Sequence, residues 1–312
     1  MDKISEEKIE NRFQFCKMDD SLNERIDAPA YSYSQAVIRN FFRSKTSIVI
    51  LLIMTIVVLM SMIQPLFSGY SFMDVSEINN FDARYNPPSA KFWFGTDGDG
   101  KSLFDAVWAG AKTSISIGVL STVICEGLGV IIGAIWGNSK RIDHFMLEVY
   151  NVISNVPQLL VVLVLSYAFG SGFWNLLFAM TCTSWFMTAY FIRVQVMIMR
   201  DREYNLASRT LGTKTWRLII KNIFPYLVSV IITDASKKLP EFISYEVFLS
   251  FLGVGLSVET PSLGRIINNY APNMSNYPYL FWIPVFVLAL VTVSLYLVGQ
   301  RLADASDPRT HL

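Results

Sequence analysis

Five long apolar segments constrain the fold of this sequence more than any other feature. Each is close to the roughly 20 residues that a helix needs to cross a hydrocarbon core of about 30 Å. The composition agrees, because 52% of the 312 residues are hydrophobic and only 16% are charged, whereas soluble domains carry about 25% charged residues. We therefore predict an all-α polytopic membrane protein. The five segments are residues 47–67, 113–137, 145–169, 173–198 and 279–298.

A sixth apolar segment, about residues 226–256, is interrupted by the polar stretch TDASKKLPE. In a helix, Asp234 lies one turn before Lys237 and Lys238. Glu241 lies one turn after them, so opposite charges pair at i,i+3 and i,i+4 spacing. Such pairing makes a crossing tolerable when the charged face is turned to protein or water. We predict a sixth transmembrane helix here; a re-entrant or surface loop is the alternative, since irregular backbone is allowed at membrane depth only where it is shielded.

The distribution of Lys and Arg predicts which ends of the helices face the cytoplasm. With six crossings and a cytoplasmic N-terminus, the basic residues gather in the inner loops and flanks, which satisfies the positive-inside rule with both termini in the cytoplasm. The inner set is Arg39, Arg43, Lys45, Lys140, Arg141, Arg200, Arg202, Arg209, Lys214, Arg217, Lys221, Arg301 and Arg309, and the outer set is Arg84, Lys91, Lys101, Lys112 and Arg265.

The stretch SQAVIRNFFRSK, just before the first span, has one apolar side and two arginines a turn apart. We predict an interfacial helix over residues 34–45, lying on the inner leaflet; an ordinary positively charged flank is the alternative. The chain then divides into a flexible cytoplasmic segment over 1–33, this helix, a transmembrane domain over 46–302 and a cytoplasmic tail over 303–312.

Few cysteines and histidines limit the chemistry that this chain can perform. Cys16, Cys125 and Cys182 show no CxxC spacing, and His144 and His311 are the only histidines. We therefore predict neither a disulfide framework nor a metal site. The formal net charge of +1 gives no overall field that would attract nucleic acid. We also expect no catalytic residues and no cofactor bound by this chain.

The stretch GTDGDGKS at residues 95–102 matches the phosphate-loop pattern G-x-x-x-x-G-K-S. In the predicted topology it lies outside the membrane, where ATP is not supplied. A phosphate loop also needs a preceding strand and a parallel sheet, and the loop 68–112 offers only KFWF and a short helix. A calcium loop is excluded similarly, because Lys101 follows Asp97 and Asp99 where a third oxygen ligand should stand. We interpret the stretch as a turn leading into a short outer helix.

The longest internal polar stretch, DREYNLASRTLGTKTWRLIIKNIFP at 201–225, predicts a projecting helical hairpin. One short helix is expected over 204–211, a left-handed break at Gly212, and a second helix over 215–223 that ends before Pro225. Apolar side chains rimmed by basic ones predict a docking surface for another protein; a mobile solvated loop is the alternative. The apolar residues are Leu206, Leu211, Trp216 and Ile220, and the basic ones Arg209, Lys214 and Arg217.

Three glycines in the second span predict close helix packing. Gly129, Gly133 and Gly137 repeat at four-residue spacing, so one stripe of the helix has no side chains and a second helix can approach closely. The partner helix belongs either to this chain or to a neighbouring subunit. In other spans, Pro157 and Pro240 are expected kink points, because each removes one helical hydrogen bond.

Ionisable residues inside spans are candidate positions on a wet pathway through the membrane. Glu126 lies in the apolar run of the second span, and a satisfied interior hydrogen bond is its alternative role. Asp234, Lys237, Lys238 and Glu241 either line such a pathway, offering both signs of charge, or pin their helix to a neighbouring one.

The internal loop also resembles that of a known family, the membrane permease subunits of binding-protein-dependent ABC importers. These subunits carry an E-A-A-x-x-x-G signature that fits a groove on the ATPase subunit. In LASRTLG, Ala207, Ser208 and Gly212 sit on this pattern, and Leu206 stands where the family prefers Glu. That departure puts a salt bridge at this position in doubt and leaves docking intact.

Other motifs narrow the resemblance to the C-type permease of oligopeptide and dipeptide importers. FGTDGDGKS resembles the family's outer-loop G-T-D-x-x-G-R-D, and SFLGVG, TPSLG and the closing DASDPR resemble its later motifs. The resemblance covers nearly the whole chain from about Ser34. The sequence departs from the family at Leu263, where Trp is usual, and at TDASKKLPE, where small or apolar residues are usual.

The resemblance implies a type I ABC importer permease fold, alternating access and import of peptides. Implied partners are a second homologous permease, two cytoplasmic ATPases that bind ATP and Mg²⁺, an extracellular peptide-binding protein and the lipid of a bacterial plasma membrane. The 201–222 loop is implied to be the coupling helix region. A secondary transporter or channel acting without ATPases is the alternative, although the sequence lacks the matching broken helices of inverted repeats. The residues implied to couple are Leu206, Ala207, Ser208, Arg209, Leu211, Gly212 and Thr213.

Overall fold

The computed structural model describes residues 33–74 and 81–306. The predicted segment 1–33, apart from Tyr33, and residues 307–312 of the predicted tail lie outside the described residues. The chain divides into two compact units, residues 1–36 and 37–312, and the description below concerns the second unit. The described residues are mainly helical and contain no β-strand, only one isolated bridge between Thr96 and Ser102.

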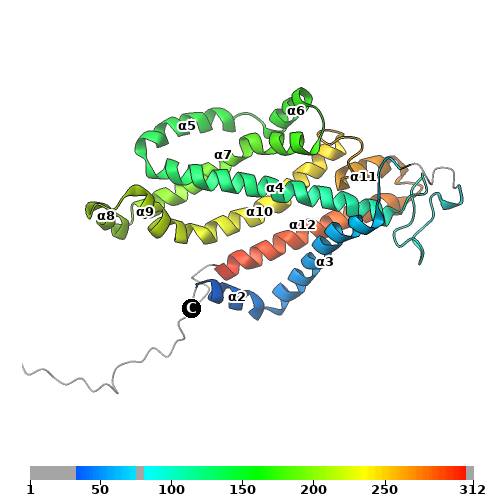
Figure 1. The fold of residues 1–312 in the computed structure, drawn as a ribbon, viewed down its shortest axis with the longest axis horizontal. Helices are drawn as coiled ribbons and strands as arrows, with labels where there is room; N and C mark the ends of the chain where they lie inside the picture. The colour runs from blue at the N-terminus through cyan, green and yellow to red at the C-terminus, as the bar shows by residue number, and fades with distance from the viewer. Residues whose placement is uncertain (1–32, 75–80, 307–312) are drawn as a thin grey trace, which may run out of the picture. The chain divides into compact units, whose positions relative to one another are not determined.

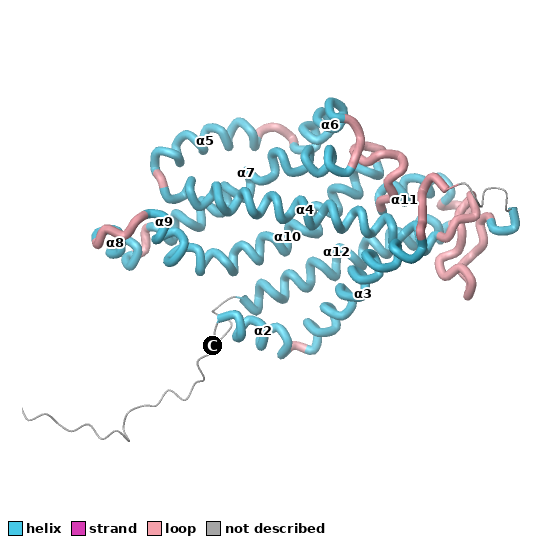
Figure 2. Tube along the Cα trace, in the orientation of Figure 1, coloured by secondary structure: helices cyan, strands magenta, loops and turns pink. Residues whose placement is uncertain are grey.

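Long apolar helices form the body of this unit (Figures 1 and 2). Within the described ranges, five helical stretches are long and apolar enough to cross a membrane, which confirms the all-α polytopic class. They are α3 (Lys45–Ser68), α4 (Leu103–Asn138), α7 (Phe173–Arg200), α10 (Phe224–Phe251) with the turns that precede it, and α12 (Pro278–Ser306). Shorter helices are α2 (Tyr33–Arg43), η2 (Phe81–Ala83), α11 (Leu263–Tyr270) and η4 (Ala271–Asn273).

A sixth crossing is broken into α5 (Lys140–Ser154) and α6 (Gln158–Phe169), which are bent by 78°. The sequence predicted one helix over 145–169 with a kink, and the structure corrects this to two helices. Pro157 explains the break, because proline disfavours helical backbone in the residue before it and has no N–H to donate.

The packing of α4 on α7 shows that the α5–α6 pair returns the chain across the bundle. Gly129 lies against Thr188, and Gly137, two turns later, lies against Val196. Residue numbers rise together along the two helices, so α4 and α7 run parallel. The chain between them therefore travels back from the end of α4 to the start of α7, so the α5–α6 pair acts as one span and the described residues hold six candidate crossings.

Contacts at both ends of the bundle agree with six crossings. The N–H of Gly172, before α7, donates to the carbonyl of Gly255, after α10 (2.7 Å). At the other end, Val37 and Phe41 of α2 pack in one apolar cluster with Ala305 of α12. The first and last described helices therefore meet at the end of the bundle where α7 finishes.

The start of α4 differs from the prediction. A short outer helix and a span over 113–137 were expected, but α4 is one helix of 36 residues, ~54 Å long at 1.5 Å per residue. Lys112, assigned to the outer loop, lies inside it. The extra turns are buried by protein: at Gly110 an added Cβ would lie 2.7 Å from Ile266 of α11. Contact with α11 explains why this part of α4 lacks the composition of a lipid-facing span.

The entry into α10 also differs from the prediction. The second helix of the hairpin was expected to end before Pro225, but α9 (Thr215–Leu218) continues through a π-helical turn, Ile219–Ile223, directly into α10. Pro225 lies in the first turn of α10 but inside this continuous helical path, so its missing N–H removes one bond that a regular helix would form. TDASKKLPE is helical throughout, so the loop alternative is wrong; α10 ends at Phe251 rather than near 256.

Candidate functional site

An exposed apolar patch projects from one end of the bundle, on α8 (Glu203–Thr210), the turn after it, α9 and the π-helical turn that follows α9. The two helices are joined by a turn in which Gly212 has φ +80°, the left-handed conformation that the sequence predicted. Leu211 at the tip is 86% exposed. Large apolar side chains gathered at a projecting tip mark an interaction surface. We call this patch the α8–α9 surface; it consists of Leu206, Leu211, Trp216 and Ile220, all exposed.

Hydrogen bonds fix α8 to three of the crossing helices. Asn205 is fully buried; its Nδ2 donates to the carbonyl of Met199 in α7 (2.8 Å), and its Oδ1 accepts from Asn222 (3.0 Å) in the turn before α10. Arg209 donates to Oδ1 of Asn138 at the end of α4 (2.6 Å). These bonds attach α8 to the ends of α4 and α7 and to the turn before α10.

The residues predicted for coupling fall into two groups. Leu206, Ala207, Leu211 and Gly212 are exposed, whereas Ser208 and Thr213 are partly buried and Arg209, although exposed, is tied to α4. The sequence analysis missed Asn205, which is buried, and Asn222, which is partly buried; their carboxamides do the anchoring. Their signal was weak, because one buried asparagine in a short polar helix has no hydropathy pattern.

A charged cluster lies between α4, α7 and α10. Lys238 Nζ is 3.3 Å from Oε1 of Glu126 and 2.6 Å from Oδ2 of Asp234, and it also bonds Oγ1 of Thr188. Less than a fifth of each ionisable side chain is exposed. Three of the residues predicted as pathway candidates are thus brought together, with one ammonium between two carboxylates, so the ionised cluster carries a net charge of −1.

Lys237 and Glu241 do not join this cluster. Both are exposed, and neither forms an ion pair within the described part of the chain. The predicted pairing is therefore wrong for these two and right for Asp234 with Lys238. Successive helical residues point about 100° apart, so a helix that turns Lys238 toward α4 turns Lys237 away from it.

A cavity of ≈ 390 Å³ opens beside the cluster, between α6, α7 and α10. Lys238 and Glu241 line this cavity. Polar groups that the sequence analysis missed line it too, among them Gln158, whose side-chain amide donates to Ser184 Oγ (2.6 Å). Gln158 and Ser184 also line a second cavity of ≈ 210 Å³ at the α5–α6 break. Pro157 lines the second cavity, and Gln158, the next residue, lines both; hydropathy alone does not reveal a cavity at this break.

The glycine stripe packs inside this chain rather than against another subunit. A Cβ added at Gly133 would lie 2.5 Å from the carbonyl oxygen of Ala189, and one at Gly137 would lie 2.7 Å from that of Arg193. These neighbours are backbone atoms of α7 and cannot rotate away. Of the two alternatives for Gly129, Gly133 and Gly137, the structure therefore has the intrachain one, and α4 and α7 form one tightly packed pair.

The phosphate-loop match is a turn that binds its own carboxylate. Oδ1 of Asp97 accepts hydrogen bonds from the backbone N–H groups of Asp99 (2.9 Å) and Lys101 (2.8 Å). The Lys101 ammonium donates to the carbonyl of Phe72 (2.8 Å). Asp97 thus takes the place that a phosphate would need, since the amides that would cradle the anion are already used.

Comparison with known families decides what kind of protein carries these features. Residues 129–312 match the family described as binding-protein-dependent transport system inner membrane component. This chain belongs to that family. Residues 32–88 of this inner membrane component also match the N-terminal TM domain of oligopeptide transport permease C. The protein is therefore a multi-pass membrane component of a transport system and not an enzyme.

Three curated relatives align over almost the whole of this inner membrane component. The oligopeptide transport system permease protein AmiD of Streptococcus pneumoniae is 57% identical over 96% of this chain and 97% of its own length. The oligopeptide transport system permease protein OppC of Bacillus subtilis is 34% identical over 92% and 93%. The dipeptide transport system permease protein DppC of Bacillus subtilis is 34% identical over 92% and 89%. The C-type resemblance drawn from the motifs is confirmed.

Proposed function

We propose that this chain is the permease subunit of an ATP-driven importer of oligopeptides and forms half of the translocation pathway with a second, homologous permease. The observation that carries the proposal is the 57% identity to an oligopeptide permease over 96% of the chain. The aligned 300 residues are enough to span both the helices around the cavities and the α8–α9 surface.

The α8–α9 end of the bundle faces the cytoplasm of a bacterium in this proposal, with both chain termini on that side of the plasma membrane. The predicted inner set of Lys and Arg supports this orientation, because most of its described members lie at that end, on or beside α2, α5, α8 and α9. Arg39 and Arg43 on α2 would then lie near the headgroups of the inner leaflet.

Two cytoplasmic ATPases supply the energy, and ATP and Mg²⁺ bind to them rather than to this chain. The α8–α9 surface supports docking of such a partner, because Leu211 and Trp216 present apolar area that no described residue covers. The rigid attachment of α8 to α4, α7 and α10 would convert closure of the ATPases into movement of the crossing helices.

The cavity between α6, α7 and α10 is the proposed contribution of this chain to the peptide pathway. Gln158 and Ser184 offer hydrogen bonds to a peptide backbone, and Glu241 offers a carboxylate without an ion-pair partner in the described ranges. These groups recognise features common to all peptides rather than one side chain. The peptide would bias the two access states only by its differential affinity for them.

Uptake of a labelled oligopeptide into proteoliposomes tests the proposal. The vesicles contain this chain, the second permease and the two ATPases, with ATP inside the compartment that the ATPases face and the peptide-binding protein on the other side. Trp216→Ala is expected to lower uptake about tenfold, since truncating one central aromatic anchor of an interface costs more than ~1 kcal/mol. Trp174→Ala is the matched control, because Trp174 is 70% exposed, comparable with 61% for Trp216, and begins α7 at the opposite end.

The proposal fails if peptide enters vesicles that lack the ATPases, because that result would make the chain a secondary transporter or channel. It fails in its coupling part if Trp216→Ala and Trp174→Ala transport equally well.

A further inference from the structure

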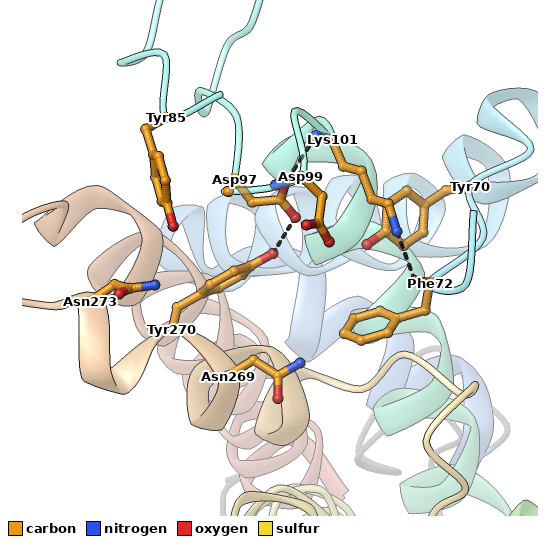
Figure 3. Close-up of a pocket in the computed structure, with 10 residues that line it drawn as sticks. Tyr70, Phe72, Tyr85, Asp97, Asp99, Lys101, Asn269, Tyr270 and Asn273 are labelled. Atoms are coloured by element: carbon orange, nitrogen blue, oxygen red, sulfur yellow. Dashed lines mark hydrogen bonds between the residues drawn. The ribbon is translucent and has the colours of Figure 1, made fainter. Parts of the chain in front are cut away.

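A small pocket lies in the loops at the end of α4 opposite to the α8–α9 surface (Figure 3). Asn138, the last residue of α4, accepts a hydrogen bond from Arg209 of α8. Leu103, the first residue of α4, directly follows the loop that forms the pocket. The helix between them is ~54 Å long, well beyond the ~30 Å of a hydrocarbon core. The pocket and the α8–α9 surface therefore lie on opposite sides of the membrane.

The walls of the pocket come from three separate chain segments and are largely aromatic. Tyr70 follows α3, Tyr85 belongs to the loop before α4, and Tyr270 closes α11. The Tyr85 ring is held in place by stacking on Tyr277, with centroids 4.0 Å apart. Because the walls are braced by neighbouring elements, the pocket is formed before any ligand arrives.

Some polar groups of the pocket are already satisfied. The buried Asp97 accepts a third bond from the Tyr270 hydroxyl (2.8 Å) in addition to two backbone amides. The Lys101 ammonium is held by the carbonyl of Phe72. The Asp97 carboxylate is thus largely satisfied, whereas the Lys101 ammonium keeps its charge and two further N–H donors.

Other polar groups of the pocket have no partner within the described part of the chain. The Asp99 carboxylate is exposed and forms no ion pair there, and it points toward the space between Tyr70 and Tyr270 (Figure 3). No side-chain hydrogen bond of Asn269 or Asn273 is formed within the same ranges, although both line the pocket. One free carboxylate and two free carboxamides thus converge between aromatic rings.

This set of groups selects a cation. A free carboxylate and amide oxygens accept hydrogen bonds from an ammonium or guanidinium group, and aromatic faces attract the same charge. The ionised lining groups, Asp97, Asp99 and Lys101, carry a net charge of −1, which disfavours an anion. The volume of ≈ 210 Å³ is below the roughly 300–1,000 Å³ of sites that enclose a small-molecule ligand, so the occupant is one side chain and not a whole peptide.

We propose that this pocket receives a single basic side chain, Lys or Arg, of the extracellular binding protein on which this transport family depends. The inference rests on the proposed function, which places the pocket outside the cell. The pocket shares no lining residue with the cavity between α6, α7 and α10, which argues for a partner's side chain rather than for the transported peptide. A charge on an interface rim acts mainly on the rate of association.

The test measures binding of the binding protein to the purified transporter complex in nanodiscs, by biolayer interferometry. Asp99→Asn is expected to slow association about three- to tenfold, and the difference from the wild type should shrink in 0.5 M salt as the charges are screened. Asp99→Glu should retain association. Asn269→Asp adds a carboxylate at an exposed position and should speed it. Glu259→Gln is the matched control, because Glu259 is exposed in the loop after α10 and lines no part of this pocket.

The proposal is overturned if intact complexes carrying Asp99→Asn and Glu259→Gln associate equally fast. It is also overturned if Asp99→Asn leaves docking unchanged and instead weakens binding of a free lysine-containing oligopeptide, since the pocket would then take cargo. Docking is measured without transport. A wild-type complex that binds its partner and imports no peptide would therefore contradict the proposed function and leave the pocket inference standing.

Discussion

Replacing Lys238 by methionine is expected to destabilise the bundle strongly. The ammonium lies 3.3 Å from Glu126 and 2.6 Å from Asp234, and the exposed fractions of the three side chains are 16%, 10% and 18%. Removing one partner of such a buried group leaves uncompensated charge and costs about 3–5 kcal/mol, more than 100-fold in an equilibrium constant. Lys237→Met is the matched control, because its side chain is exposed and unpaired among the described residues.

Thermal unfolding of the purified complex, followed by size-exclusion chromatography, provides the measurement. Lys238→Met should lower the midpoint clearly and Lys237→Met should not. Neutralising both carboxylates as well, in Glu126→Gln/Asp234→Asn/Lys238→Met, should restore most of the loss, because replacing a whole buried ionic cluster is often nearly neutral. If Lys238→Met melts like Lys237→Met, the cluster does not hold the three helices together. Uptake by the restored triple variant then decides whether the charges also serve the pathway.

Further substitutions test the packing and the anchoring of α8. Gly133→Leu should prevent assembly, because its side chain meets the backbone of Ala189, whereas Gly127→Leu on the same helix should assemble normally, since no atom lies within 4 Å of an added Cβ there. Asn205→Leu removes two hydrogen bonds, whereas the Met199 carbonyl still accepts from the Arg202 N–H and Asn222 Nδ2 still donates to Ser208 Oγ, so the local cost is about 1–3 kcal/mol. Hydrogen exchange in α8 should rise in Asn205→Leu and stay unchanged in Glu203→Gln; equal protection in the two would contradict the anchoring role. Asp97→Asn should loosen the loop before α4, since a carboxamide cannot accept all three bonds that Asp97 receives; unchanged proteolysis of that loop would argue against this.

The spans that face lipid were predictable because their length and hydropathy are dictated by the bilayer. α3 and α12 need little beyond an uninterrupted apolar run, and the sequence located both to within a few residues at their starts. The first turns of α4 were missed because their burial comes from α11, a contact between residues about 150 positions apart. A pattern within one segment contains no information about such a distant partner.

Breaks and continuations were harder to predict than spans. Pro157 and Pro225 carry the same local signal, yet the first separates α5 from α6 and the second lies inside a continuous helical path. The difference lies in the surroundings: Leu218, Ile219 and Ile223 are buried in a cluster with Ile192 and Val196 of α7, and this packing favours a π-helical turn over an interruption.

For the candidate sites, the sequence indicated the residue types better than their roles. Glu126, Asp234 and Lys238 were proposed as pathway groups, and the structure joins them in one cluster beside the cavity. Lys237 and Glu241 had the same charge pattern and point elsewhere. The rotation of α10 about its axis, which tertiary packing sets, separates these cases.

One measurement tests both the side of the membrane on which the α8–α9 surface lies and the partner that this surface binds. A cysteine introduced at Leu211, the most exposed of the four surface residues, should cross-link to an ATPase subunit in native membranes and should resist a membrane-impermeant maleimide applied to intact cells. Labelling of that cysteine from outside the cell, or its failure to capture any ATPase while the complex is hydrolysing ATP, would contradict the account.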